Sequence, residues 1–489
     1  MNRLSHPTEH LDRVDARSLR SARASLLFAV VALFLAALLP RLFSRGMFVD
    51  GITYAAIARN LALGRGSFWK PFYTQTLYPV FVEHPPLALW LESLAFRLVG
   101  DARHIEALYS LVCGLLLCLL VVALWRALDL RDHAGSWFAL LLLALVPLTS
   151  WMFANNMLEN TMVLFTSAAL VLFLHGQRTP STPRALAWGF AAGLAVVAAF
   201  LSKGPVGLFP LAWPAVTFAV WPQGRRRQTV AVAAGALAAL TVAVIAMASS
   251  AEASTSLLAY LRTQVAASIS GRRIEAHTAR YYIVLSIVSN LAIPVLTSVA
   301  LKLHQRTPLR YERATAALGL LALLASLPIA LSGKQSAWYA YPSYPVYAVF
   351  LAVLFGSAAA RGEKWFAASR QRRQWLVYGS VVVVVVALVA GVLDRHNVRK
   401  QRAFHADFTS QPVAMPTDQL VTVCPPELMT DWSLHANFMR TFQASLTDQA
   451  GAPWYLRQVQ RACQVPAGCV AVHPPQPQTY ERFRCSKGR

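Results

Sequence analysis

The amino-acid sequence predicts an α-helical polytopic membrane protein of about eleven transmembrane helices, followed by a small C-terminal α/β domain outside the membrane. Of the 489 residues, 56% are hydrophobic and only 14% are charged. This fraction of hydrophobic residues is larger than the core of a soluble domain requires. Apolar segments recur at roughly the 20-residue length of a spanning helix. Four of the six cysteines lie together in the C-terminal tail.

The apolar segments define the expected spans. They lie near 24–43, 104–125, 134–150, 159–175, 185–202, 205–221, 229–248, 283–301, 314–331, 337–358 and 375–393. Two connecting segments, 44–103 and 249–282, are much longer than the others. The predicted organisation is a basic segment over 1–23, a membrane domain over 24–393 and a tail domain over 394–489.

Basic residues predict the orientation of these spans. The first 23 residues are rich in arginine, and arginine or lysine recurs in alternate connecting loops. Short basic loops remain in the cytoplasm, and eleven spans place all of these on one side. We therefore expect an inner (plasma) membrane protein with a cytoplasmic N-terminus, a first span that acts as an uncleaved anchor, and an external tail. The net charge of +23 reflects this topology, and its dispersion argues against a nucleic-acid partner.

The tail cysteines indicate disulfide bonds. Cys424, Cys463, Cys469 and Cys485 form an even set in a short, exported domain, which favours two disulfides and leaves three pairings open. Zinc binding is the alternative, but the spacing contains no CxxC pair. Within this domain "QLVTVC" (419–424) and "CVAVH" (469–473) are typical of strands, and 428–446 and 453–463 of helices.

The first long loop contains two short helices. The segment from Ile52 to Leu63 is expected to be helical, with Asp50 as its N-terminal cap and Gly64 at its end. Pro85 and Pro86 mark the start of a second helix that ends at Gly100. This second helix is too short to span, and its apolar stripe predicts that it lies along the membrane interface. The stripe consists of Leu87, Trp90, Leu91, Leu94 and Leu98.

Several of these features together resemble a known enzyme family. An acidic residue just after the first span, an aromatic residue four positions later, "HPPL" at 84–87 and an amphipathic helix ending in glycine resemble the GT-C glycosyltransferases. The branch resembled contains the protein O-mannosyltransferases and the bacterial lipid A aminoarabinose transferases. "LSKGPVGLFPL" (201–211) and "SGKQSAWYAYPSYPVYAVFLA" (332–352) resemble later segments of that branch. The resemblance covers roughly 24–360 and not the tail.

The resemblance implies an activity and a first set of site residues. Such enzymes take a sugar from a polyprenyl-phosphate donor and pass it to a lipid, glycan or protein acceptor of the cell envelope. Asp50 would be the general base of an inverting, in-line displacement. Lys203 and Lys334 would bind the donor phosphate, although a lysine at the end of a span can instead simply reach the headgroups. Arg59 matches a family arginine and would meet the phosphate or face solvent.

The chain departs from the family at one position. The family commonly has Asp-Glu where this chain has Asp50 followed by Gly51. Glu83 could replace the missing carboxylate or be solvated. His84 could bind phosphate, contact the acceptor, ligate a divalent metal together with Glu83, or be an ordinary loop histidine. No other cofactor is implied.

Further candidates lie in the second loop and in a late aromatic segment. Arg272 and Arg273 belong to "GRRIEAHTARYY", which also contains Glu275 and His277, and which would be a lid or a solvated surface. Four aromatic residues would stack on sugar or form an interfacial belt. These are Tyr54, Trp338, Tyr339 and Tyr341.

Two other classes of function compete with the transferase. A transporter or flippase for a lipid-linked or small polar substrate usually carries ionisable residues within its spans, near the midplane. Here the spans are almost free of them, and charge gathers at the outer rim. A scaffold without chemistry would leave that outer cluster unexplained. The sequence therefore favours a glycosyltransferase, and leaves its sugar and acceptor open.

Overall fold

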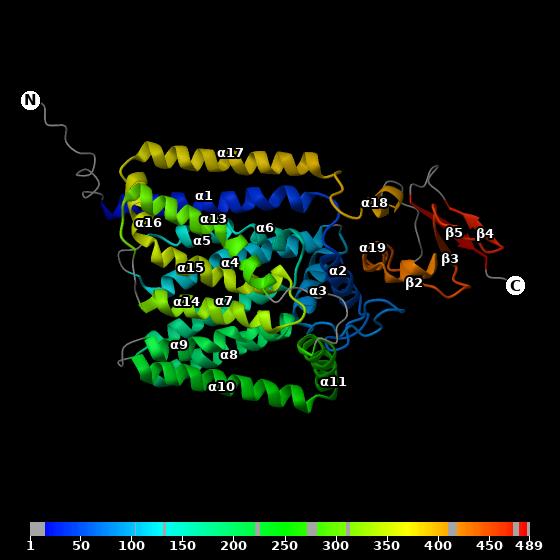
Figure 1. Cartoon of the computed structure of the whole chain (residues 1–489), viewed down its shortest axis with the longest axis horizontal. Coiled ribbons are helices and arrows are strands. Elements are labelled where there is room, and N and C mark those ends of the chain that lie inside the picture. Colours follow the sequence, from blue (N-terminus) through cyan, green and yellow to red (C-terminus); the bar gives the residue numbers. More distant parts are fainter. Residues whose placement is uncertain are drawn as a thin grey trace, which may run out of the picture.

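A helical bundle with a small sheet domain at one end makes up the structure (Figure 1). The computed structural model describes residues 15–102, 104–130, 134–220, 225–270, 281–309, 313–408, 418–472 and 479–486. Eight helices in these ranges are long and apolar enough to cross a membrane. They are α1 (Ala16–Phe43), α4 (Ile105–Leu128), α7 (Glu159–Arg178), α8 (Thr182–Lys203), α10 (Arg226–Ser249), α13 (Tyr282–Gln305), α14 with its 3₁₀ extension (Arg313–Leu331) and α17 (Arg370–Asp394).

Two of the expected spans are broken rather than straight. Helices α5 (Trp137–Ala144) and α6 (Pro147–Ala154) meet at a bend of 74°. The bend follows from Pro147, whose ring cannot continue the hydrogen-bond ladder of α5. The segment Ala337–Leu354, which contains α15 (Tyr344–Leu354), bends by 74° into α16 (Gly356–Ala367). The segment Pro205–Val220, which ends in α9 (Ala212–Val220), is a shorter apolar helix.

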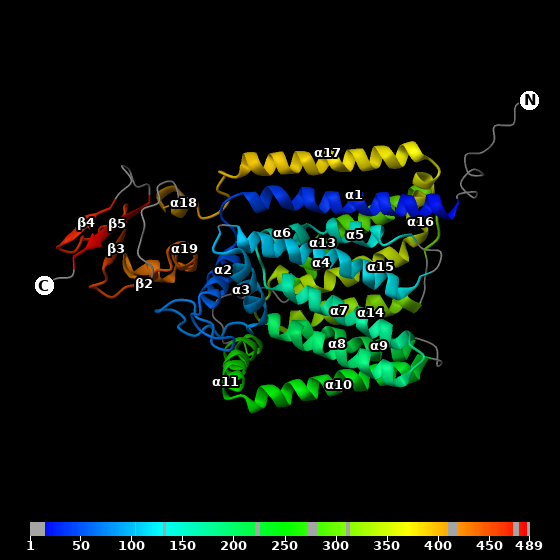
Figure 2. The same ribbon diagram turned by 180° about the vertical axis from the view of Figure 1, so that it is seen from behind.

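The outward faces of the bundle are apolar, as expected for contact with lipid. Helix α17 packs along α1 at one side of the bundle (Figures 1 and 2). Its Val382, Val386 and Leu393 remain exposed. Exposed apolar surface of this extent on a long helix is typical of a membrane span rather than of a soluble domain.

Both long loops and the tail gather at the same end of the bundle. Helices α2 (Val49–Ala62) and α3 (Leu87–Val99) lie at the end of the bundle that carries the sheet domain, and α11 (Ala251–Tyr260) lies at the same end, whereas the start of α1 and α16 lie at the opposite end (Figures 1 and 2). This arrangement agrees with the expectation that 44–103, 249–282 and the tail share one side.

The two short helices occur where they were expected, but Asp50 is not a cap. Helix α2 begins at Val49 with Phe48 as its N-cap, so Asp50 lies inside the first turn. The Phe48 N–H donates to Asn155 Oδ1 at 2.7 Å, which anchors the start of α2 to the connection after α6. Helix α3 begins after Pro86 and ends at Gly100, as predicted.

Helix α3 keeps its apolar stripe on the outer side. It buries the opposite face, formed by Ala88, Leu89, Glu92, Ser93 and Phe96. Leu98, in the stripe, is 85% exposed. This orientation fits a helix that lies along the interface with its apolar stripe towards lipid.

The tail forms one five-stranded sheet covered by helices. Its elements are α18 (Arg402–Phe408), β1 (Leu420–Cys424), α19 (Trp432–Phe442), β2 (Ser445–Thr447), β3 (Trp454–Gln458), β4 (Cys469–Ala471) and β5 (Tyr480–Cys485). The strand order is β2-β1-β3-β5-β4. Strand β1 runs parallel to β2 and β3, and β5 runs antiparallel to β3 and β4.

This sheet confirms two predicted strands and corrects two predicted helices. Strands β1 and β4 lie in the segments 419–424 and 469–473. The helix expected over 453–463 is wrong, because Trp454–Gln458 is strand β3 and pairs with β1 on one side and β5 on the other. The helix expected over 428–446 is shorter than predicted, because α19 ends at Phe442 and β2 follows.

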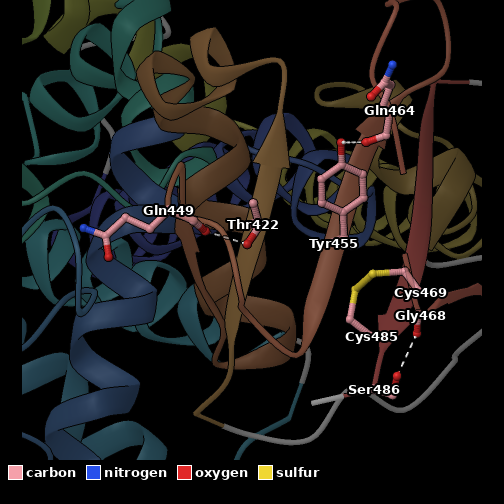
Figure 3. The surroundings of a disulfide bond; sticks show 8 residues. All are labelled: Thr422, Gln449, Tyr455, Gln464, Gly468, Cys469, Cys485 and Ser486. Atoms are coloured by element: carbon pink, nitrogen blue, oxygen red, sulfur yellow. Dashed lines mark hydrogen bonds between the residues drawn. A yellow bond between two sulfur atoms is a disulfide. The ribbon is translucent and has the colours of Figure 1, made fainter. Parts of the chain in front are cut away.

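Two disulfides close the tail domain, as the cysteine count predicted. Cys424 bonds to Cys463, and Cys469 bonds to Cys485. The second bond joins β4 to β5, and beside it Ser486 Oγ donates to the Gly468 carbonyl at 3.1 Å (Figure 3). Each bond links parts of the domain that are distant in sequence, so both restrict its unfolded chain.

Candidate active site

Asp50 and Lys203 meet at the end of the bundle that carries α2. Asp50 is half-buried in the first turn of α2, and Tyr54, one turn later, brings its hydroxyl to 3.5 Å from Asp50 Oδ2. Lys203 is the last residue of α8, and its Nζ lies 3.4 Å from the same hydroxyl. Tyr54 therefore connects a carboxylate from the first long loop to a cation at the end of a span.

A second carboxylate, Glu159, completes this cluster. Glu159 is the first residue of α7, and its Oε1 lies 3.0 Å from Lys203 Nζ in an almost fully buried ion pair. Glu159 was not predicted as a site residue, because it is the first residue of the expected span 159–175. An ionisable residue at the start of an apolar span is itself a functional signal, and could have identified it.

The electrostatics of the cluster favour a basic Asp50. Burial raises the pKa of Asp50 above its usual value, while the positive charges of Lys203 and Lys334 act in the opposite direction. Burial also raises the pKa of Tyr54 well above its usual value, so its hydroxyl stays protonated. Asp50 is thus a carboxylate of increased basicity next to two cations.

The close packing around Gly51 explains why this chain lacks the second acidic residue of the family pattern. A Cβ at position 51 would lie 2.0 Å from the Asn155 carbonyl oxygen, so no side chain fits without a shift of backbone. The neighbouring Asn156 donates its amide to the Gly51 carbonyl at 3.4 Å and to Glu92 Oε1 at 2.7 Å. The start of α2 is therefore packed directly against the connection between α6 and α7.

The second long loop fixes the backbone of Lys203. Gly204 has φ +111°, in the region that favours glycine, and a Cβ there would lie 1.9 Å from the Tyr260 hydroxyl oxygen. That hydroxyl donates to the Lys203 carbonyl at 3.2 Å. Because Tyr260 ends α11, the second loop holds the position from which Lys203 reaches Asp50.

Two of the residues predicted from the late aromatic segment lie near the cluster, and one does not. Lys334 is half-buried and its positive charge acts on Asp50, and the half-buried Tyr339 lies in the electrostatic environment of Lys203. Tyr341 is fully buried and contacts the Phe153 ring at 6.0 Å. The prediction that Tyr341 stacks on a sugar is therefore wrong, since the ring belongs to the bundle core.

His84 joins the cluster, whereas Glu83 connects the two long loops. His84 Nε2 lies 3.1 Å from the Tyr54 hydroxyl. Glu83 Oε1 accepts hydrogen bonds from the Tyr78 hydroxyl at 3.0 Å and from the Gln264 amide at 3.5 Å. In the parts of the chain that the structure describes, no group of three or more His, Cys, Asp or Glu could hold a metal ion. The divalent metal considered for Glu83 and His84 stays a prediction.

Arg59 is directed away from the cluster and into the tail domain. Its side chain is 2% exposed and donates to the carbonyls of Met439 and Arg440, both at 2.5 Å. Arg440 in turn binds Asp101 at 3.0 Å and Glu106 at 3.1 Å. Burial lowers the pKa of Arg59 to about 10, which leaves it charged at neutral pH. The expectation that Arg59 meets the donor phosphate or faces solvent is therefore wrong, because its side chain holds α19 against α2.

The predicted lid residues Arg272 and Arg273, together with Glu275 and His277, lie outside the described residues.

The chain is similar to known membrane glycosyltransferases. Residues 83–251 match the family described as dolichyl-phosphate-mannose-protein mannosyltransferase. Over 199 residues the chain is 27% identical to the undecaprenyl phosphate-alpha-4-amino-4-deoxy-L-arabinose arabinosyl transferase 1 of Proteus mirabilis (strain HI4320). That alignment includes 40% of this chain and 34% of the relative, so the chain matches about a third of the relative's length.

Solved structures share the fold over nearly the whole chain. The crystal structure of ArnT from Cupriavidus metallidurans bound to undecaprenyl phosphate superposes with a TM-score of 0.58 and 17% identity, over 94% of this chain and 97% of that one. The structure of the same protein in the apo state gives a TM-score of 0.58 and 16% identity, over 93% and 96%. The resemblance to the GT-C glycosyltransferases is confirmed, and the fold shared with ArnT covers 94% of this chain, so it includes at least part of the tail domain.

Proposed function

We propose that this protein is a glycosyltransferase that moves a sugar from a polyprenyl-phosphate donor to an acceptor of the cell envelope. The observation that carries the proposal is the cluster of Asp50, Tyr54, Lys203 and Glu159, in which a carboxylate of raised pKa lies beside buried cationic charge. An in-line displacement at an anomeric carbon needs both a base and a cation for the leaving phosphate.

In the proposed reaction, Asp50 removes the proton of the attacking acceptor group. The new bond forms between the acceptor atom and the anomeric carbon, and the bond from that carbon to the donor phosphate oxygen breaks. The electron pair of the broken bond stays on the polyprenyl phosphate, whose charge Lys203 and Lys334 stabilise. Attack opposite the leaving group inverts the anomeric centre.

Glu159 and Tyr54 would be positioning residues in this reaction. The Glu159 carboxylate holds the Lys203 ammonium from within the bundle, and the Tyr54 hydroxyl lies between that ammonium and Asp50. A buried lysine with a fixed partner loses little side-chain freedom when a phosphate binds. The cation would therefore be oriented before the donor arrives.

The decisive experiment is the Asp50→Asn substitution in purified full-length protein. The amide keeps the shape of the carboxylate but cannot accept the proton, so transfer from a polyprenyl-phosphate sugar should fall by about 10²–10⁴. Because burial raises the pKa of Asp50, the acid limb of the wild-type pH profile should lie above the usual aspartate range. The matched control is Asp129→Asn. Asp129 directly follows α4 in the left-handed conformation, which asparagine adopts as readily as aspartate. A folded Asp50→Asn protein with wild-type turnover would exclude the base assignment.

The proposal also requires that the cluster faces the outside of the membrane. Reporter fusions after residues 100 and 420 should both report an external location, and fusions after 226 and 370 a cytoplasmic one. This follows from the basic loops at the opposite end of the bundle. A cytoplasmic report from residue 420 would reverse the proposed orientation and place the tail disulfides in a reducing compartment.

A further inference from the structure

Three aromatic rings form a platform around Phe48, which lies two residues before Asp50 in the sequence. It consists of Phe48 at the start of α2, Trp151 in α6 and Trp338 before α15. The indoles of Trp151 and Trp338 stack with centroids 5.6 Å apart, and the Phe48 ring lies 5.3 Å and 5.2 Å from them. All three side chains are partly exposed. Three separate segments of the membrane domain therefore meet in one accessible aromatic surface.

A lysine from the segment after α17 is seated on this platform. Lys400 Nζ lies 4.9 Å from the centroid of Phe48 and 5.7 Å from that of Trp151. Within the described ranges no carboxylate lies within ion-pair distance of it. A half-buried ammonium whose neighbours are aromatic faces retains its attraction for an anion.

The backbone holds Lys400 in this place. The segment around it pairs with the residues before Phe48, through Arg45 N–H to the Asn397 carbonyl and Arg399 N–H to the Arg45 carbonyl, both at 2.9 Å. Gln401 also donates to the Met47 carbonyl at 2.9 Å. A cation fixed by its backbone is a preorganised binding group.

The location of the platform indicates what kind of ligand can reach it. It lies where α1, α6 and α17 end, at the end of the bundle that carries α2 and the tail domain (Figures 1 and 2). This is the level of lipid headgroups for a bundle of such spans. Arg41, exposed near the end of α1, contacts Ser150 next to Trp151 at 3.3 Å and adds a second cation.

We infer that Phe48, Trp151, Trp338 and Lys400 form a subsite for the headgroup of an anionic membrane lipid. The phosphate binds Lys400 by a charge-assisted contact. The sugar or glycerol part of the headgroup lies against the tryptophans, whose indole N–H groups have no hydrogen-bond partner among the described residues. The inference concerns binding alone and does not depend on the proposed transfer reaction.

An ordinary interfacial belt is the competing explanation, since tryptophans gather at membrane surfaces without binding any specific lipid. A belt predicts no preference between anionic and neutral lipids at this place. It also predicts no dependence on Lys400. These two differences make the inference testable by lipid binding.

The test measures how purified full-length protein retains phosphatidylglycerol against phosphatidylcholine, by native mass spectrometry. Wild type should prefer phosphatidylglycerol, and Lys400→Gln should weaken that preference about ten-fold through the lost charge-assisted contact. Trp338→Leu should weaken it as well. The matched control is Lys364→Gln in α16, at the other end of the bundle, which should bind as wild type does. Thermal unfolding of each variant excludes a loss through misfolding.

A second arm separates the possible sources of the headgroup. A phosphorylated disaccharide lipid and inorganic phosphate are each offered as competitors. Displacement by the glycolipid at lower concentration than by further phosphatidylglycerol would support a sugar-bearing lipid, and equal displacement would support any anionic lipid. Displacement by inorganic phosphate at the same concentration would overturn the lipid assignment. Wild-type retention of phosphatidylglycerol by both Lys400→Gln and Trp338→Leu would overturn the inference entirely.

Discussion

Lys203 Nζ lies 3.0 Å from Glu159 Oε1, in an ion pair whose two side chains are 6% and 0% exposed. The lysine ends one span and the glutamate begins another, so the pair joins α8 to α7 beside the Tyr54 hydroxyl of α2. A buried ion pair contributes little net stability compared with apolar residues of the same volume, because both charges lose their water. Its presence here therefore suggests a role in positioning the cation rather than in holding the fold.

The first prediction separates these two roles. Lys203→Ala leaves the Glu159 charge buried and unpaired, which should cost about 3–5 kcal/mol of stability. The double variant Lys203→Met with Glu159→Gln removes both charges and should recover most of that loss in thermal unfolding. Donor use should remain low in the double variant, because the phosphate still lacks its cation. Recovery of both stability and donor affinity would mean that Lys203 serves the fold alone.

The second prediction concerns Gly51. Gly51→Glu, which recreates the Asp-Glu pattern of the family, should destabilise the protein by about 1–3 kcal/mol because the new side chain overpacks the Asn155 carbonyl. The control is Gly362→Glu in α16, where a Cβ meets nothing within 4 Å. Denaturation of the two variants should differ clearly. Equal stability would show that the α6–α7 connection moves easily, and the second carboxylate would then be tolerated.

The third prediction is a pH dependence of stability that arises from Glu92. Burial raises the pKa of Glu92 to about 8, whereas its usual value is 4.5. The folded state thus binds a proton that the unfolded chain releases, so this contribution is complete below about pH 4.5 and is lost as pH rises to 8. Glu92→Gln mimics the protonated form and should flatten the decline between these values, measured by thermal unfolding across that range.

A suitable comparison for Glu92 is Glu427→Gln, which removes an exposed carboxylate in the tail domain. Its stability should follow the wild-type curve across the same pH range. If Glu92→Gln also followed that curve, Glu92 would be ionised in the folded protein at neutral pH.

The fourth prediction tests the attachment of the tail domain. Arg59→Ala removes the donors to the Met439 and Arg440 carbonyls and should increase hydrogen exchange in α19. Arg97→Ala is the matched control, since Arg97 is exposed and, within the part of the chain that the structure describes, its side chain donates only to the Leu61 carbonyl of α2. Unchanged exchange in α19 after Arg59→Ala would show that Arg440 and its acidic partners suffice to dock the domain.

How far the sequence predicted the candidate site can be judged from individual residues. Asp50, His84 and Lys203 were identified from motifs and do lie together around Tyr54. Glu159 was missed, because an acidic residue at the edge of an apolar segment looks like part of that span. Arg59 was misassigned, since its partners lie 380 and 381 positions away in the tail.

The sequence by itself determined the fold class, eight of the eleven expected spans as long apolar helices, the two helices of the first loop and the number of disulfides. Each of these follows from local properties, namely hydropathy over about 20 residues, proline and glycine at helix ends, and the cysteine count. Only the tertiary structure decided the pairing of Cys424 with Cys463, the strand at Trp454–Gln458 and the partners of Lys203 and Arg59. These depend on which distant segments pack together, and a carboxylate or a guanidinium acquires its role only from the groups that burial brings within a few ångströms of it.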